Sequence, residues 1–133
     1  EARFELVRIG ISSFGTSPID GVKASSLGLD CPMTLTAKAV TQGLNSIGFL
    51  HGYFSKFSGL AYVYIAGVKY KVLKVEALTT EIEAGHYRVG DEVLVFGGET
   101  SGAATAQELC DLVYTVTDEL FTGLSPDSTL YTY

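Results

Sequence analysis

The sequence predicts one mainly β domain over residues 1–133, a small antiparallel barrel or sandwich with one C-terminal helix. Confirmation of the helix would make the domain α+β. Three observations predict this: a hairpin pattern in mid-chain, short runs of alternating apolar and polar residues, and a helical apolar stripe near the C-terminus. The length of 133 residues suits a single core, and 15 glycines can supply turns between short strands. With 47% apolar and 18% charged residues, the composition excludes a disordered chain.

The N-terminal segment predicts a strand over Phe4–Ser12, because its apolar residues partly alternate with charged residues and glycine. A turn-rich loop follows over Ser13–Gly28, and long loops of small domains are often contact surfaces. The first residues have neither the basic start nor the apolar stretch of a signal peptide, which favours an intracellular origin.

The segment Met33–Thr41 alternates apolar residues with threonine and lysine, which favours a strand. A helix that starts here, with Asp30 as its N-cap and Pro32 in its first turn, is the alternative. The following segment, Ile47–Phe57, is aromatic and broken by glycine.

The strongest pattern is a β-hairpin formed by Leu60–Ala66 and Lys69–Ala77 around a turn at Gly67. In its second strand the alternation of faces slips near Leu73, which indicates a β-bulge. Two further strands are expected over Thr79–Glu83 and Glu92–Phe96.

After Gly97–Gly98 the spacing of apolar residues becomes helical, and the apolar stripe is Ala106, Leu109, Val113, Val116 and Leu120. Thr100 or Ser101 would cap this helix and Gly123 would end it. A strand over Leu112–Thr117, which is rich in valine and threonine, stays open as an alternative. Residues 124–133 are expected to form an arm that packs against another surface, because they end in apolar and aromatic residues.

Catalytic and cofactor motifs are absent, so the sequence predicts no catalytic residue, no metal ligand and no cofactor. The glycine-rich turn Gly97–Gly102 resembles an anion-binding turn, but Glu99 would repel a phosphate and no lysine or arginine follows it. Cys31 and Cys110 are expected to be small buried residues, and a disulfide between them stays open.

Charge is unevenly distributed along the chain. Residues 1–88 contain nine basic and seven acidic residues, a net charge of +2, whereas residues 89–133 contain eight acidic residues and no basic one, −8. The total of −6 argues against nucleic-acid binding, which needs lysine and arginine to neutralise phosphates. The acidic third is either a solvated face or a surface that meets a basic neighbour.

The segment His86–Phe96, which follows the hairpin Tyr62–Ala77, resembles the turn and strand of small SH3-like or OB-like barrels. Such barrels recur in virion proteins of tailed bacteriophages. The resemblance implies a non-catalytic capsid decoration (cement) or tail-associated subunit, located in the virion and assembled in the host cytoplasm. Its implied partners are copies of itself, with a trimer as one option, and a larger capsid or tail protein, without nucleic acid or membrane. The expected contact residues are Leu130, Tyr131, Tyr133, Tyr62, Tyr64 and Tyr70.

A different class of function stays open beside this one. The chain could be a small intracellular ligand-binding protein or an enzyme, with a pocket near His51 and His86. The two interpretations differ in where the histidines lie, because only the second needs them to converge.

Overall fold

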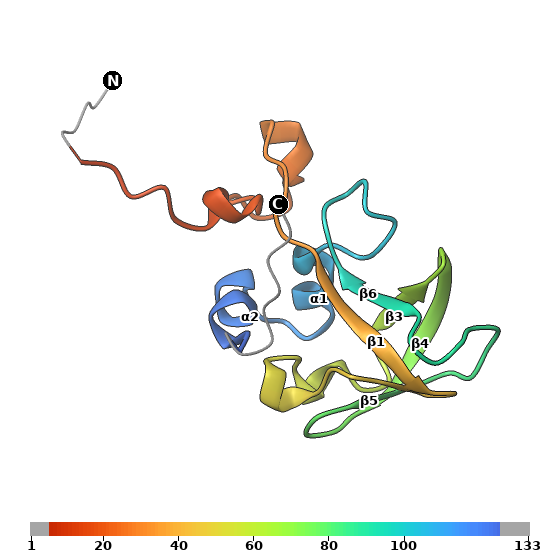
Figure 1. The fold of residues 1–133 in the computed structure, drawn as a ribbon. Coiled ribbons are helices and arrows are strands. Elements are labelled where there is room, and N and C mark those ends of the chain that lie inside the picture. The colour runs from red at the N-terminus through yellow and green to blue at the C-terminus, as the bar shows by residue number, and fades with distance from the viewer. Residues whose placement is uncertain (1–5, 126–133) are drawn as a thin grey trace.

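The computed structural model describes residues 6–125 and shows a closed barrel of six antiparallel strands with two helices on one side (Figure 1). The predicted barrel is confirmed, whereas the single helix is wrong, because two helices form. The strands neighbour one another in the order β1-β2-β5-β4-β3-β6, and β6 pairs back onto β1. Their bounds are β1 Leu35–Thr41, β2 Leu44–Asn45, β3 Tyr62–Ile65, β4 Val68–Val75, β5 Thr80–Ile82 and β6 Glu92–Phe96.

The predicted hairpin is confirmed as β3 and β4, which pair antiparallel around a two-residue turn. In β3, Val63 and Ile65 face the core and the two tyrosines face outward. The predicted bulge is also confirmed, because the β4–β5 register shifts between Val72 and Lys74 and leaves Leu73 exposed. The shift turns Val75 inward, so β4 contributes apolar side chains to the core on both sides of the bulge.

The predicted strand over Met33–Thr41 is confirmed as β1, and the alternative helix does not form. Strand β1 closes the barrel on β6, with Leu35 opposite Phe96 and Lys38 opposite Glu92. Strands β5 and β6 correspond to the strands expected over 79–83 and 92–96. Closure pairs every strand on both sides, so the barrel leaves no free sheet edge.

The two helices are α1 Ala106–Leu112 and α2 Thr117–Gly123. Thr105, not the predicted Thr100 or Ser101, caps α1 in a capping box: its hydroxyl accepts the N–H of Glu108, whose carboxylate accepts the N–H of Thr105. Helix α2 ends at Gly123, as expected. Both helices bury residues of the predicted stripe against the barrel, namely Ala106, Leu109 and Leu120.

The predicted continuous helix is interrupted at residues 113–116, where neither a helix nor the alternative strand forms. Tyr114 adopts the left-handed backbone region, with φ of 55°, and its side chain is 99% exposed. The Thr115 N–H then bonds the Cys110 carbonyl, which closes the end of α1. The β-branched residues of this segment favour helix weakly, which explains why the stripe breaks there.

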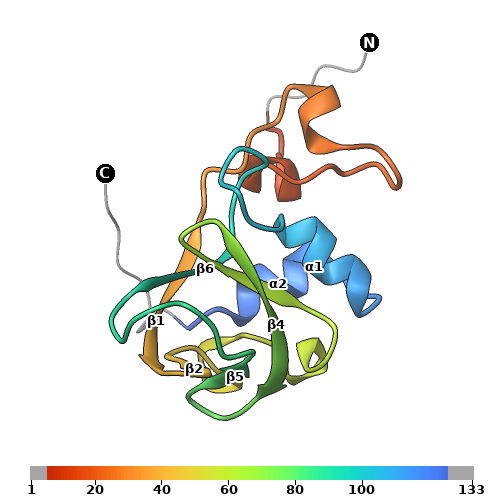
Figure 2. The same ribbon diagram turned by 90° about the vertical axis from the view of Figure 1, so that its right-hand side faces the viewer.

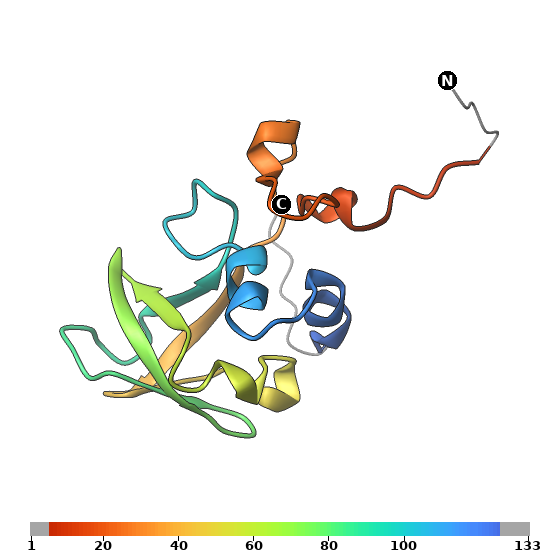
Figure 3. The same ribbon diagram turned by 180° about the vertical axis from the view of Figure 1, so that it is seen from behind.

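Between the second and third strands, the chain forms 3-10 helices at Phe49–His51 and Ser55–Phe57, on the same side of the barrel as α1 and α2 (Figure 3). The N–H groups of Phe49 and Leu50 donate to carbonyls of the β4–β5 connection, both at 2.9 Å. At the end of the 3-10 helix Phe49–His51, Gly52 has φ of 91° and lies against the backbone of Gly123. This close approach fixes the segment against α2.

The strand predicted over Phe4–Ser12 is wrong for the described residues. Residues 6–9 have no strand partner there, and a 3-10 helix spans Gly10–Phe14. Residues 6–23 form an N-terminal arm that runs away from the barrel (Figures 1 and 2). Its contacts with the rest of the structure include the Phe14 ring, which stacks on Phe121 at 5.2 Å between centroids.

Cys31 and Cys110 are both free, so they do not form a disulfide. Cys110 is buried, and burial raises the pKa of its thiol to about 12. Cys31 is half-buried, and its thiol donates to the Met33 carbonyl. Among residues 6–125, no helix has the length and apolar character needed to cross a membrane.

Candidate functional site

The structure places the two histidines in unrelated surroundings. His51 lies in the 3-10 helix Phe49–His51, where its Nδ1 accepts the N–H of Gly48 at 3.0 Å. His86 is exposed in the connection between β5 and β6. Neither histidine lines either of the two surface hollows described below. The two histidines therefore do not converge on either hollow, as the expected pocket near His51 and His86 required.

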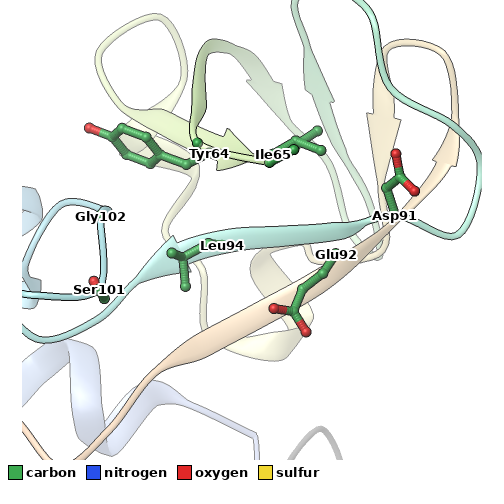
Figure 4. A pocket seen from close by; sticks show the side chains of 9 residues that line it. Tyr64, Ile65, Asp91, Glu92, Leu94, Ser101 and Gly102 are labelled. Carbon is green, nitrogen blue, oxygen red and sulfur yellow. The ribbon is translucent and has the colours of Figure 1, made fainter.

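The first hollow lies on the outer face of the barrel, between β3, β6 and the turn that precedes α1 (Figure 4). Tyr64 and Leu94, which are cross-strand neighbours, form its apolar part. Asp91 and Glu92 form its acidic end, and Ser101 and Gly102 form the opposite end.

The polar groups of this hollow are not arranged for acid–base chemistry. Asp91 and Glu92 point in different directions (Figure 4). One oxygen of Asp91 accepts the N–H of Arg88 at 2.8 Å, which ties it to its own turn. The hydroxyl of Ser101 accepts the N–H of Ala103 and has no histidine beside it in the hollow. A nucleophile and its base are therefore not both present here.

The second hollow lies where the segment between β2 and β3 meets α2, and it combines two aromatic rings with opposite charges. Phe49 and Phe54 supply its apolar surface, and Lys56 and Glu119 supply its charges. The Glu119 carboxylate also accepts a hydrogen bond from the Thr115 hydroxyl. Both charged groups are exposed to solvent, which weakens any ligand contact that they make.

Among residues 6–125, two buried side-chain polar atoms lack a hydrogen-bond partner: the hydroxyl of Tyr53 and the side-chain nitrogen of Asn45. Tyr53 is fully buried and packs against Phe57, with 4.8 Å between ring centroids. Burial raises the pKa of its hydroxyl, so the group stays protonated and is not a base. Tyr87 is a contrasting buried tyrosine, whose hydroxyl accepts the N–H of Gly43 at 2.7 Å.

Removing the two buried hydroxyls should therefore affect stability differently. We expect Tyr53→Phe to leave the free energy of unfolding unchanged or to raise it by about 1 kcal/mol, because an unpaired buried hydroxyl disappears. We expect Tyr87→Phe to lower it by about 1 kcal/mol, because the Gly43 N–H loses its acceptor. Urea denaturation of both variants checks this, and a larger loss for Tyr53→Phe would contradict it.

The predicted contact tyrosines fall into two groups. Tyr62 and Tyr64 are half-exposed on β3, with the Lys69 ammonium 3.9 Å from the centre of the Tyr62 ring. Tyr70 is 7% exposed and packs edge-on against Tyr87 inside the barrel, so it offers little surface to a partner. The other predicted contact residues, Leu130, Tyr131 and Tyr133, lie outside the described residues, as does most of the expected arm 124–133.

Within residues 6–125, no group of three or more histidine, cysteine, aspartate or glutamate side chains is placed to hold a metal ion. Neither hollow contains a cluster of basic groups that would hold an anionic cofactor.

Comparison with known proteins gives a consistent result. Residues 24–131 match a family model described as the alanine racemase C-terminal domain. An alanine racemase of Mycolicibacterium smegmatis is 28% identical over 146 aligned positions, which cover 90% of this chain and 38% of that protein. A lysine racemase of Proteus mirabilis is 30% identical over 107 positions, covering 77% of this chain and 25% of that protein.

Solved structures of alanine racemases share the fold. The biosynthetic enzyme of Pseudomonas aeruginosa has a TM-score of 0.79 at 21% identity, over 89% of this chain and 39% of that one. The enzyme of Streptomyces coelicolor A3(2) also has a TM-score of 0.79, at 22% identity, over 94% of this chain and 40% of that one.

This chain spans between 25% and 41% of the length of the curated relatives it matches. The alignment with the Mycolicibacterium smegmatis enzyme runs over 146 positions, more than the 133 residues of this chain. Because the aligned 90% of the chain amounts to about 120 residues, about 26 positions are filled only in the relative. The relative therefore contains segments in this region that this chain lacks.

These matches correct the predicted function. The resemblance to tailed-bacteriophage virion proteins is wrong, because the chain matches a racemase domain over residues 24–131. Three expectations rested on this resemblance and are wrong for the same reason: the decoration or tail-associated role, the capsid or tail partner, and the virion location. The prediction that the protein is not an enzyme is also wrong, because the relatives are racemases, which are enzymes.

The correction has a physical reason. The segment His86–Phe96 does form a turn and a barrel strand, β6, so the local pattern indicated the type of fold correctly. A short turn-and-strand pattern recurs in unrelated barrels because it reflects closure of a sheet, not chemistry. The match that identifies the family covers residues 24–131, far more of the chain than the dozen residues of this pattern.

Proposed function

Because this chain belongs to the alanine racemase C-terminal domain family, we propose that it is the barrel domain of an amino-acid racemase and acts together with a domain that precedes it. The observation that carries this proposal is the family match over residues 24–131, which include all six strands and both helices. The shared barrel of the solved racemases supports the same assignment at the level of the fold.

The chemistry of racemisation explains why the barrel would need another domain. An amino acid changes configuration when its Cα proton is removed from one face and a proton is returned to the other, so acid–base groups must stand on both sides of the substrate. Neither hollow of the barrel offers such a pair: one has divergent carboxylates, and the other has an exposed lysine and glutamate. We therefore propose that groups of the complete polypeptide transfer the protons, and that the barrel forms part of the wall of the substrate site.

The proposed substrate is a free α-amino acid, with alanine and lysine tested first because the relatives are named for them. Self-association of the complete polypeptide, expected from the sequence, is part of the proposal. Tyr62 and Tyr64 remain its proposed contact residues, because they are the described members of the predicted set with exposed surface.

The test is an assay of the complete polypeptide that contains this chain. The purified protein is incubated with L-alanine or L-lysine in deuterated water. The D-enantiomer is measured by chiral chromatography, and deuterium at Cα by mass spectrometry. We expect both signals from the complete polypeptide and neither from the 133-residue chain alone. A folded complete polypeptide that yields neither signal would overturn the proposal, and so would a natural polypeptide that consists of these 133 residues only.

A further inference from the structure

The connection between α1 and α2, residues 113–116, and the end of α1 beside it expose apolar side chains that the core does not use. Tyr114 is 99% exposed, Val116 is 61% exposed, and Leu112, the last residue of α1, is 41% exposed. None of the three belongs to the hydrophobic core or packs against it. Because they are close neighbours in the sequence, they form one continuous apolar surface at the end of the helix pair.

Tyr114 occupies its position at a cost to folding. Its φ of 55° lies in the left-handed region, where a Cβ is crowded by the following carbonyl and glycine is favoured. The turn needs this conformation, because the N–H of Thr115 then donates to the Cys110 carbonyl at 3.1 Å. A ring that is 99% exposed buries almost no area that could offset this strain. The ring therefore has no role in the fold of residues 6–125.

Two carboxylates flank Tyr114 along the chain, and each is held by a local hydrogen bond. Asp111 accepts the side-chain N–H of Gln107 at 2.8 Å, and Glu119 accepts the hydroxyl of Thr115. Both aspartate and glutamate are exposed, so their charges face the solvent beside the apolar side chains.

No basic residue balances these two carboxylates. Residues 89–125 contain no lysine or arginine, and the only ion pair among residues 6–125 joins Lys74 and Glu76. Lys56, which lines the second hollow with Glu119, therefore forms no ion pair with it. Burial is the main cause of the raised pKa of the Cys110 thiol, and Asp111 and Glu119 add to it, so both charges act at the same end of α1. Five residues thus form an aromatic, apolar and negatively charged surface, called the Tyr114 surface below: Asp111, Leu112, Tyr114, Val116 and Glu119.

We infer that the Tyr114 surface binds an arginine-containing segment of another protein. A guanidinium stacks on an exposed tyrosine ring and pairs with carboxylates, and an ammonium does this less well. An aromatic anchor with charged groups around it is also the arrangement in which one tyrosine contributes much of the free energy of binding. The partner is basic because the surface carries only negative charge, which attracts basic segments and repels acidic ones.

This inference selects one of the two interpretations of the acidic third, the surface that meets a basic neighbour. It is independent of the proposed function, because Tyr114 lines neither hollow and binding is measured without an amino-acid substrate. A complete polypeptide that racemises amino acids but does not bind the segment rejects only this inference. One that binds the segment but does not racemise rejects only the proposed function.

Fluorescence anisotropy tests the inference with a defined probe, the fluorescein-labelled peptide (Arg-Leu)3-amide, titrated with the complete polypeptide that contains this chain. We expect saturable binding that weakens at least about 10-fold when the salt concentration rises from about 0.1 M to about 1 M. The peptide (Lys-Leu)3-amide should bind at least about 3-fold more weakly, because its ammonium groups do not stack on the ring. The peptide (Glu-Leu)3-amide, with the same apolar content, should not bind.

Tyr114→Gly separates recognition from folding. It removes the ring and relieves the backbone, so we expect binding to weaken at least about 10-fold while the melting temperature does not fall. Tyr114→Phe keeps the ring and should bind within about 2-fold of the unmodified protein. A lower melting temperature for Tyr114→Gly would assign the ring to the fold and overturn the inference.

A matched pair of charge variants tests the carboxylates. Asp111→Asn removes the charge and keeps an acceptor for Gln107, and Asp20→Asn makes the same change at an exposed position in the N-terminal arm. We expect the first to weaken binding about 3-fold and the second less than about 1.5-fold. Equal effects of this pair, equal binding of the arginine and glutamate peptides, or equal binding by the unmodified protein and Tyr114→Gly would each overturn the inference. So would a complete polypeptide that binds none of the peptides, as expected if another part of it covers Tyr114.

Discussion

Replacing Gly52 by alanine should cause a large loss of stability. Gly52 has φ of 91°, which disfavours a side chain, and an added Cβ would lie 2.2 Å from the carbonyl oxygen of Gly123. The methyl group can be accommodated only if the end of α2 moves away from the 3-10 helix Phe49–His51. We expect the free energy of unfolding to fall by more than about 4 kcal/mol, as measured by urea denaturation.

Gly90 provides the matched control for this prediction. Its φ is 92°, nearly the same as that of Gly52, but nothing lies within 4 Å of an added Cβ. Gly90→Ala therefore carries the backbone strain without the collision, and should cost about 1–2 kcal/mol. Equal losses for the two variants would show that the contact between Gly52 and Gly123 does not hold α2 in place.

The second large effect is expected for Phe57→Ala. The Phe57 side chain is fully buried between the rings of Tyr53 and Phe54, at 4.8 and 5.4 Å between centroids. Truncation would leave a cavity where the segment between β2 and β3 packs against β4. It should lower the free energy of unfolding by about 3–5 kcal/mol. Urea denaturation measures this loss of stability. It can be followed by circular dichroism or by tyrosine fluorescence, since the chain contains no tryptophan.

Phe49→Ala is the control for the core prediction, because it removes the same ring from a side chain that is 48% exposed. We expect it to cost about 1 kcal/mol, in proportion to the smaller area withdrawn from water. If Phe49→Ala lowered the free energy of unfolding as much as Phe57→Ala, the main contact of this segment would be the 3-10 helix Phe49–His51 and not the 3-10 helix Ser55–Phe57.

The barrel was predictable from the sequence where local pairing decides the structure. The hairpin and the bulge at Leu73 follow from alternation alone, because both strands lie close together in the sequence. Strand β1 was distinguishable from a helix by its period of two, although a cap and a proline at Asp30 and Pro32 suggested a helix start.

The errors occur where local pattern does not decide the structure. The strand expected over Phe4–Ser12 does not form among the described residues, where residues 6–9 pair with no strand and Gly10–Phe14 form a 3-10 helix. The helical stripe was read as continuous because Val113 and Val116 fit its period, while the left-handed Tyr114 between them breaks the helix. The candidate site was not predictable, because the residues that line each hollow come from elements far apart in the sequence.

Closure of the barrel through β1 and β6 has a consequence for the order of synthesis. Leu35 pairs with Phe96, so β1 leaves the ribosome long before its partner strand exists. At about 5–20 residues per second, the delay lasts several seconds, during which one edge of β1 stays open to aggregation or to chaperones. Both strands of the hairpin β3–β4 are synthesised before β6, so the hairpin can form as a local unit before the barrel closes. Codon usage that slows translation between β1 and β6 would lengthen this exposed interval.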